Sequence, residues 1–184
     1  MGYQSLYSNI SGNCNIALGR ETLNDNYGGD HNIAMGMCTL RSNTTGDYNT
    51  GIGACVLKAN TTGSYNVGMG CGALNVNTTG QFNTALGEGT LGANTTGDYN
   101  VGIGGYALDE NTIGEENVAI GRCTLKANVT GGCLVAVGSK ALCSNNWTGF
   151  STAVGHEVLM TSVTASHNTG VGFRALCKAN PTRS

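Results

Sequence analysis

The chain has little charge. Only 11% of its 184 residues are charged, and the formal net charge is −2 at pH 7. Because a nucleic-acid-binding protein presents a basic stripe or patch to the phosphate backbone, this composition argues against nucleic acid as a partner. The chain also lacks any apolar run near the roughly 18 residues that a membrane-spanning helix requires, so we expect no membrane span.

Residue groupings that carry catalysis or bind metals are missing as well. Eight cysteines and three histidines are present, yet there is no Cys-x-x-Cys pair and no cysteine–histidine cluster with metal-ligand spacing. No serine or cysteine is framed as a nucleophile, the carboxylates form no paired constellation, and a glycine-rich phosphate loop is absent. We therefore expect no enzyme activity, no cofactor and no metal site.

What the chain has instead is a 17-residue repeat without insertion or deletion. A leucine marks every repeat and forms the leucine column: Leu6, Leu23, Leu40, Leu57, Leu74, Leu91, Leu108, Leu125, Leu142, Leu159 and Leu176. A glycine precedes each leucine by four residues: Gly2, Gly19, Gly36, Gly53, Gly70, Gly87, Gly104, Gly121, Gly138, Gly155 and Gly172. A strict period of this length indicates one structural unit that is repeated by stacking.

The segment before each of these glycines predicts a β-strand. It reads NIAL, NIAM, NTGI or NVGM in the first copies, with large or β-branched residues at its second and fourth positions and Ala or Gly between them. Alternation with a period of two is typical of a strand with one buried face. A second short strand is expected to end on the repeated leucine, and Asn-Thr-Thr-Gly segments such as 43–46 supply turns. The 30 glycines disfavour helix, as does the absence of apolar residues at three-four spacing.

A 17-residue unit is too small to fold alone, so each coil must lie on its neighbours to bury its apolar positions. The predicted fold is all-β: a parallel β-solenoid or β-roll of about eleven coils, which at about 4.8 Å per strand makes a rod roughly 50 Å long. A single array spans 1–184, with regular coils over 1–138 and degenerate coils over 139–184. Because it starts in mid-coil at Met1, we expect a segment of a longer fibre.

Stacking converts each repeat position into a column of similar residues. We expect the leucine column and the Ile/Leu/Met/Val column at the end of each strand to form a continuous apolar core. Two interpretations of the small residues between them stay open: close packing against the opposite wall of the same coil, or contact with neighbouring chains about a threefold axis, since oligomerisation often compensates for a thin core. This alanine/glycine column is Ala17, Ala34, Gly51, Gly68, Ala85, Gly102, Ala119, Ala136, Ala153 and Gly170.

Two polar or aromatic columns precede the strand. The asparagines are predicted to hydrogen-bond from coil to coil as a ladder: Asn15, Asn32, Asn49, Asn66, Asn83, Asn100, Asn117 and Asn168. One residue earlier, a mostly aromatic column is predicted to stack along an edge of the rod: His31, Tyr48, Tyr65, Phe82, Tyr99, Phe150 and His167. The alternative is a face that contacts host glycans, formed by Tyr48, Tyr65, Phe82 and Tyr99.

The turns and the cysteines leave further alternatives. Most N-x-[S/T] sequons occupy the same turn position, where they serve either as turns alone or as N-glycosylation sites at Asn43, Asn60, Asn77, Asn94 and Asn128. Cys38 and Cys55 lie one coil apart, within the range of a disulfide, but cysteine often serves as a small buried residue and we favour free thiols.

Several phrases resemble the repeat of tail-fibre proteins of bacteriophages and of related viral or bacterial surface fibres: MGYQSLYSN at 1–9, NTTGDYNTGIG at 43–53 and NTTGSYNVGMG at 60–70. The NxA[I/V]G core is also similar to the head repeats of trimeric autotransporter adhesins. The resemblance covers essentially the whole chain. It implies a homotrimeric fibre of left-handed parallel β-rolls, exposed outside the cell or on a virion.

These features together predict a structural fibre shaft of a viral or phage tail fibre or of a bacterial surface appendage. Such a shaft spaces or presents a receptor-binding tip. One alternative is an adhesin that binds host surface glycans or a receptor directly through its coil edges. Another is a self-assembling extracellular filament subunit, since open coil ends are unpaired edges that invite end-to-end addition. The expected partner is a further copy of the chain, in a trimer or in an end-to-end filament.

Overall fold

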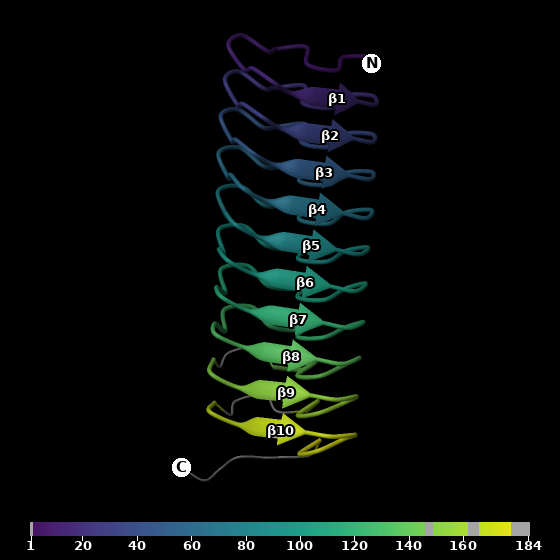
Figure 1. Cartoon of the computed structure of the whole chain (residues 1–184), viewed down its shortest axis with the longest axis vertical. Coiled ribbons are helices and arrows are strands. Elements are labelled where there is room, and N and C mark those ends of the chain that lie inside the picture. The colour runs from purple at the N-terminus through teal and green to yellow at the C-terminus, as the bar shows by residue number, and fades with distance from the viewer. Residues whose placement is uncertain (1, 146–148, 162–165, 178–184) are drawn as a thin grey trace.

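The computed structural model describes residues 2–145, 149–161 and 166–177. Within these ranges the chain is an all-β parallel solenoid that contains no helix (Figure 1). Ten strands of three residues each repeat along it: β1 (Ile16–Leu18), β2 (Ile33–Met35), β3 (Thr50–Ile52), β4 (Val67–Met69), β5 (Thr84–Leu86), β6 (Val101–Ile103), β7 (Val118–Ile120), β8 (Val135–Val137), β9 (Thr152–Val154) and β10 (Thr169–Val171).

The strands form one parallel sheet in sequence order, and each pairs with the next. The register advances by one repeat per strand, so that Ile16 pairs with Ile33 and Ala17 with Ala34. In Figure 1 the arrows lie one above another and all point the same way, while the chain advances along the rod. The predicted parallel β-solenoid is therefore confirmed. A helix with the length and apolar character needed to cross a bilayer is not found among the described residues.

The glycine after each strand allows neighbouring coils to approach closely. Gly87 has φ 137°, and a Cβ at this position would lie 2.8 Å from the carbonyl carbon of Gly104 in the next coil. Positive φ and backbone contact at this distance both exclude a side chain. The repeated glycine is thus a requirement of the stacking.

The leucine column fills the core as predicted, and its members from Leu23 to Leu159 are at most 1% exposed. The prediction of a second strand that ends on each leucine is wrong, because each repeat in the described part of the chain forms a single strand. In this wall of the coil the backbone alternates into the left-handed region, with φ 57° at Cys38 and 50° at Leu40. The wall still bonds to both neighbouring coils, because Cys38 N–H donates to Arg20 O at 2.9 Å and Leu40 N–H to Val56 O at 3.0 Å.

The orientation of the strands is opposite to our prediction. The large residue that ends each strand points outward, with Leu18 50%, Met69 47% and Ile103 36% exposed, so this column is not part of the core. The small residues point inward instead, and Ala34 and Ala85 are fully buried. Alternation with a period of two identifies two faces, but it does not say which one the coil closes upon.

The alanine/glycine column packs against the opposite wall of its own coil. A Cβ on Gly51 would lie 2.6 Å from Cγ2 of Thr39, and one on Gly68 would lie 2.5 Å from Cγ1 of Val56. The first of our two interpretations is therefore correct, and contact with neighbouring chains through this column is excluded. The division into regular coils over 1–138 and degenerate coils over 139–184 stays a prediction, and 146–148, 162–165 and 178–184 lie outside the described residues.

Candidate functional surfaces

The outward side of the ten-stranded sheet is a continuous uncharged surface, which we call the sheet face. It consists of the first and third residue of each strand, β1 to β10, and all of these are apolar or threonine. The exposed large apolar side chains on it are Ile16, Leu18, Met35, Val67, Met69, Ile103, Ile120, Val135, Val154 and Val171. An exposed apolar surface that continues from strand to strand makes the sheet face a candidate for contact with another molecule.

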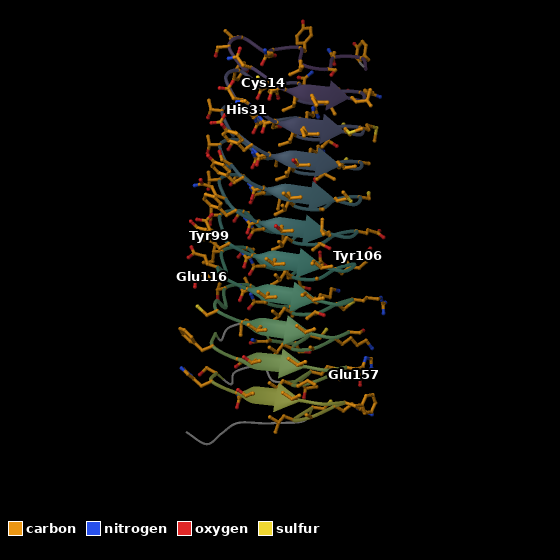
Figure 2. All side chains as sticks on the ribbon, in the orientation of Figure 1. Cys14, His31, Tyr99, Tyr106, Glu116 and Glu157 are labelled. Carbon is orange, nitrogen blue, oxygen red and sulfur yellow. The ribbon has the colours of Figure 1, made fainter. Side chains whose placement is uncertain are left out.

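A second surface is the aromatic edge, formed by His31, Tyr48, Tyr65, Phe82 and Tyr99. Successive rings stack with centroids 4.8–5.1 Å apart and planes within 9° of parallel. Figure 2 shows His31 and Tyr99 on the same edge of the rod, with Cys14 before the first ring and Glu116 after the last. The predicted stacking is therefore confirmed, and Phe150 stacks on His167 in the same way at 5.3 Å.

Ring stacking leaves little aromatic surface accessible to a sugar. A sugar that contacts an aromatic side chain lies on the face of the ring, but both faces of Tyr48, Tyr65 and Phe82 are covered by the neighbouring rings. For these three residues the ring edges and the tyrosine hydroxyl groups remain exposed, with Tyr48 49% and Tyr65 48% accessible. The geometry therefore supports an architectural role for the aromatic edge more than the predicted glycan-contact face.

Two asparagine ladders run through the interior. In the one before the strands, Asn66 Nδ2 donates to Asn49 Oδ1 at 3.1 Å and to Gly80 O at 2.8 Å, and Asn66 N–H donates to the same Asn49 oxygen at 3.0 Å. The predicted ladder is confirmed over the fully buried members Asn32, Asn49, Asn66, Asn83, Asn100 and Asn117. Buried polar groups that are all paired add order without an uncompensated desolvation cost.

The second ladder lies in the turns and was not foreseen. Asn60 Nδ2 donates to Asn43 Oδ1 at 2.8 Å and to Gly63 O at 2.9 Å, and both asparagines are fully buried. The same arrangement holds at the remaining sequons proposed for glycosylation, Asn77, Asn94 and Asn128. A glycan would have to be attached to this buried nitrogen. Glycosylation at these five asparagines therefore conflicts with the folded coil.

Charged residues gather in two small clusters. Glu157 is contacted by Lys140 at 3.6 Å, His156 at 3.4 Å and Arg174 at 3.3 Å. Glu157 lies on the edge of the rod opposite the aromatic edge (Figure 2). Since the side chains of Lys140, His156 and Arg174 are more than two-fifths exposed, their contacts with Glu157 contribute little stability each.

The other charged cluster surrounds Glu21, whose side chain is only 11% exposed. Arg20 Nη2 lies 2.8 Å from one of its carboxylate oxygens and Arg41 Nε 3.4 Å from the other. The hydrogen bond from Arg20 lowers the pKa of Glu21, and the carboxylate in turn raises the pKa of Arg20. The thiol of Cys38 donates to the same carboxylate at 3.7 Å.

All eight cysteines are free thiols in this structure. Burial and the nearby Glu21 carboxylate raise the pKa of Cys38, so that its thiol is protonated at neutral pH. The hydrogen bond that Cys133 donates to Glu116 at 3.3 Å raises the pKa of Cys133. Neither environment favours the thiolate that a nucleophilic cysteine needs.

No group of three or more His, Cys, Asp or Glu side chains that could hold a metal ion occurs in the described ranges. Comparison of the chain with protein families, with curated proteins and with solved structures gave no match. The surfaces described above, and the sequence resemblance to surface fibres, therefore carry the functional argument.

Proposed function

We propose that this chain is the structural shaft of a fibre in which several copies pack side by side through the sheet face. The carrying observation is the sheet face itself, which presents exposed apolar residues from β1 to β10 without an intervening charge. Water-exposed apolar surface on this scale is costly to leave open. Covering it converts a thin coil with a narrow core into a stiffer rod.

A further copy of the chain is the partner that fits this surface best. Two sheet faces share the same strand repeat of about 4.8 Å, so that their side chains can interdigitate along the whole rod. A trimer about a threefold axis, as the adhesin-like repeats imply, uses one such face from each copy. The contact differs from our first expectation, since the large strand residues and not the alanine/glycine column meet the neighbouring chain.

The proposed setting is the outside of a cell or the surface of a virion, where the shaft spaces or presents a receptor-binding tip. The resemblance to phage tail fibres and to bacterial surface fibres supports this placement. The in-register columns also support a role as a shaft, because a rod built of identical stacked coils holds its two ends at a fixed distance and direction from each other. Direct glycan binding and end-to-end filaments remain the alternatives, and the stacked aromatic rings weaken the first of them.

Small-angle X-ray scattering of the purified chain at several concentrations tests the proposal. We expect a rod about 50 Å long whose length stays constant while its cross-section is that of several coil stacks. A cross-section of a single coil stack at every concentration would contradict the lateral packing. Growth in length at constant cross-section would favour the end-to-end filament, and retention of the chain on a glycan array would favour the adhesin.

A further inference from the structure

Cys38 and Cys55 occupy the same repeat position in adjacent coils. Both have φ 57°, and their N–H groups make equivalent hydrogen bonds, to Arg20 O and Met37 O, each at 2.9 Å. Identical backbone geometry in register directs the two Cα–Cβ bonds the same way, one above the other. The nearness of Cys55 is also one of the causes that raise the pKa of Cys38.

The spacing of these thiols suits a bridging ion better than a disulfide. In-register neighbours in adjacent coils are about 4.8 Å apart. Their Cα separation lies within the disulfide range of about 4.4–6.8 Å, but a disulfide also needs its two Cβ atoms about 3.5–4.5 Å apart, slightly closer than parallel Cα–Cβ bonds at this spacing place them. If the two metal–thiolate bonds are near the roughly 2.3 Å of Zn–S bonds, a straight S–metal–S unit spans about 4.6 Å, close to the spacing of two parallel side chains in adjacent coils.

We propose that Cys38 and Cys55 form a two-coordinate site for a soft monovalent cation of the Cu(I) or Ag(I) class. Thiolate sulfur is the ligand type that such ions select. Binding breaks both S–H bonds, releases two protons to solvent and forms two metal–sulfur bonds, while the oxidation state of the metal is unchanged. A Zn²⁺ ion, which takes four ligands in structural sites, finds too few here.

Burial and the Glu21 carboxylate raise the pKa of Cys38 and so oppose its thiolate, but the two arginines beside Glu21 offset part of this cost. A monovalent cation held by two thiolates carries one net negative charge, and the neighbouring Glu21 carries another. Arg20 and Arg41 both contact Glu21, at 2.8 and 3.4 Å, and together supply two positive charges. The anionic complex would therefore form in a locally neutral cluster.

The other cysteines do not offer the same arrangement. Cys71 has Ala54 and Glu88 at the equivalent positions of the adjacent coils, so no thiol lies above or below it in register. Cys143 is near enough to Cys123 to feel its charge, but these residues occupy different repeat positions and are not stacked in register. Cys71 therefore provides the matched control.

The distribution of lysine and arginine makes a direct test possible. Cleavage after these residues places Cys38 on the peptide 21–41 and Cys55 on the peptide 42–58, and puts each of the other six cysteines on a peptide of its own. The folded chain is given one equivalent of Cu(I) without oxygen, briefly alkylated with iodoacetamide, unfolded, digested and analysed by mass spectrometry. Parallel samples receive Ag(I) or Zn²⁺.

The expected result is that Cu(I) and Ag(I) protect peptides 21–41 and 42–58 from alkylation together, at least tenfold more than in the metal-free chain. The same samples with Zn²⁺ should show no protection. Cys55→Ser should also expose Cys38 to alkylation and weaken Cu(I) retention against a chelator at least tenfold, whereas Cys71→Ser should change neither. Protection of other cysteines first, unchanged retention in Cys55→Ser, or a disulfide joining the two peptides would overturn the proposal.

Discussion

Gly68 and Val56 face each other across the interior of one coil, so closely that a Cβ on Gly68 would lie 2.5 Å from Cγ1 of Val56. The relationship recurs: every glycine of the alanine/glycine column faces a β-branched residue 12 positions earlier, in the pairs Gly51/Thr39, Gly68/Val56, Gly102/Thr90 and Gly170/Val158. Most alanines of the column have Ser or Ala there, as in Ala85/Ala73 and Ala119/Ala107. The two walls thus keep the interior volume nearly constant.

This complementarity predicts a compensating pair of substitutions. Gly68→Ala should destabilise the chain by about 1–3 kcal/mol, because it overfills the coil against Val56. Adding Val56→Ala should recover part of that loss, with a coupling energy of about 0.5–3 kcal/mol between neighbouring sites. Urea unfolding of the single and double variants measures both quantities.

Gly105→Ala is the matched control for this cycle, since the nearest atom to its added Cβ is 3.9 Å away and its φ is not positive. It should leave stability within about 0.5 kcal/mol of the wild type. Strict additivity of Gly68→Ala and Val56→Ala would mean that the two walls do not pack as described.

The buried asparagine ladder predicts a large cost for one truncated side chain. Asn83 Oδ1 accepts the N–H of Asn100 at 3.0 Å, and Asn83 Nδ2 donates to Gly97 O at 2.8 Å. Asn83→Ala leaves the buried Asn100 N–H without its acceptor, at a cost of about 1–3 kcal/mol. Gln81→Ala, an exposed neighbour whose backbone bond to Asp98 survives, should cost far less. Equal unfolding midpoints in urea for the two variants would refute the importance of the ladder.

The aromatic edge predicts a smaller, ring-specific effect. Tyr65 stacks on Tyr48 at 5.1 Å and on Phe82 at 4.8 Å. Tyr65→Ala removes both contacts and should cost about 0.5–1.5 kcal/mol per stack, beyond the loss of buried area. Tyr65→Phe keeps the ring and should behave like the wild type in thermal unfolding. A loss of stability in Tyr65→Phe as large as in Tyr65→Ala would show that the hydroxyl matters and not the stacking.

The raised pKa of Asp109 predicts how the stability of the folded chain changes with pH. Partial burial raises the pKa of Asp109, and Glu110 adds to this, while Lys126 opposes it. The folded state therefore favours the protonated carboxyl, and the stability associated with that form is lost as the pH rises through the folded pKa. Asp109→Asn should raise the melting temperature at pH 7, and the gain should vanish below the ordinary Asp pKa of about 3.9. A gain of the same size at both pH values would contradict this assignment.

The sequence predicted the solenoid because its 17-residue period runs through the chain without insertion or deletion. Leu40 and its equivalents could be placed in the core, and Asn66 and Tyr65 in ladders, since stacking alone puts identical positions side by side. The strand orientation could not be predicted in the same way. Met69 and Gly68 alternate, and only the width of the closed coil decides that Gly68 faces inward.

Residue types alone also did not reveal the backbone conformation of the wall around Leu40 or the burial of the asparagines in the turns. The wall around Leu40 contains non-glycine residues with positive φ, which the stacking bonds impose against local preference. The sequons were predicted as turns or glycan sites, whereas Asn60 proved to be a buried ladder residue. The pairing of Gly68 with Val56 can be seen in the sequence, because glycines in the alanine/glycine column have a β-branched residue 12 positions earlier. This relation between side-chain sizes could have indicated that the alanine/glycine column faces inward.

The sedimentation of the chain tests the central claim most directly. Analytical ultracentrifugation at several concentrations should show a stable species near three times 18.8 kDa. A charge on the sheet face, Ile103→Lys, should shift that species toward the monomer, whereas Ile113→Lys, on an exposed turn away from the sheet face, should not. A wild-type chain that sediments as a monomer at every concentration would contradict the account, because its long apolar sheet face would then have no partner of its own kind.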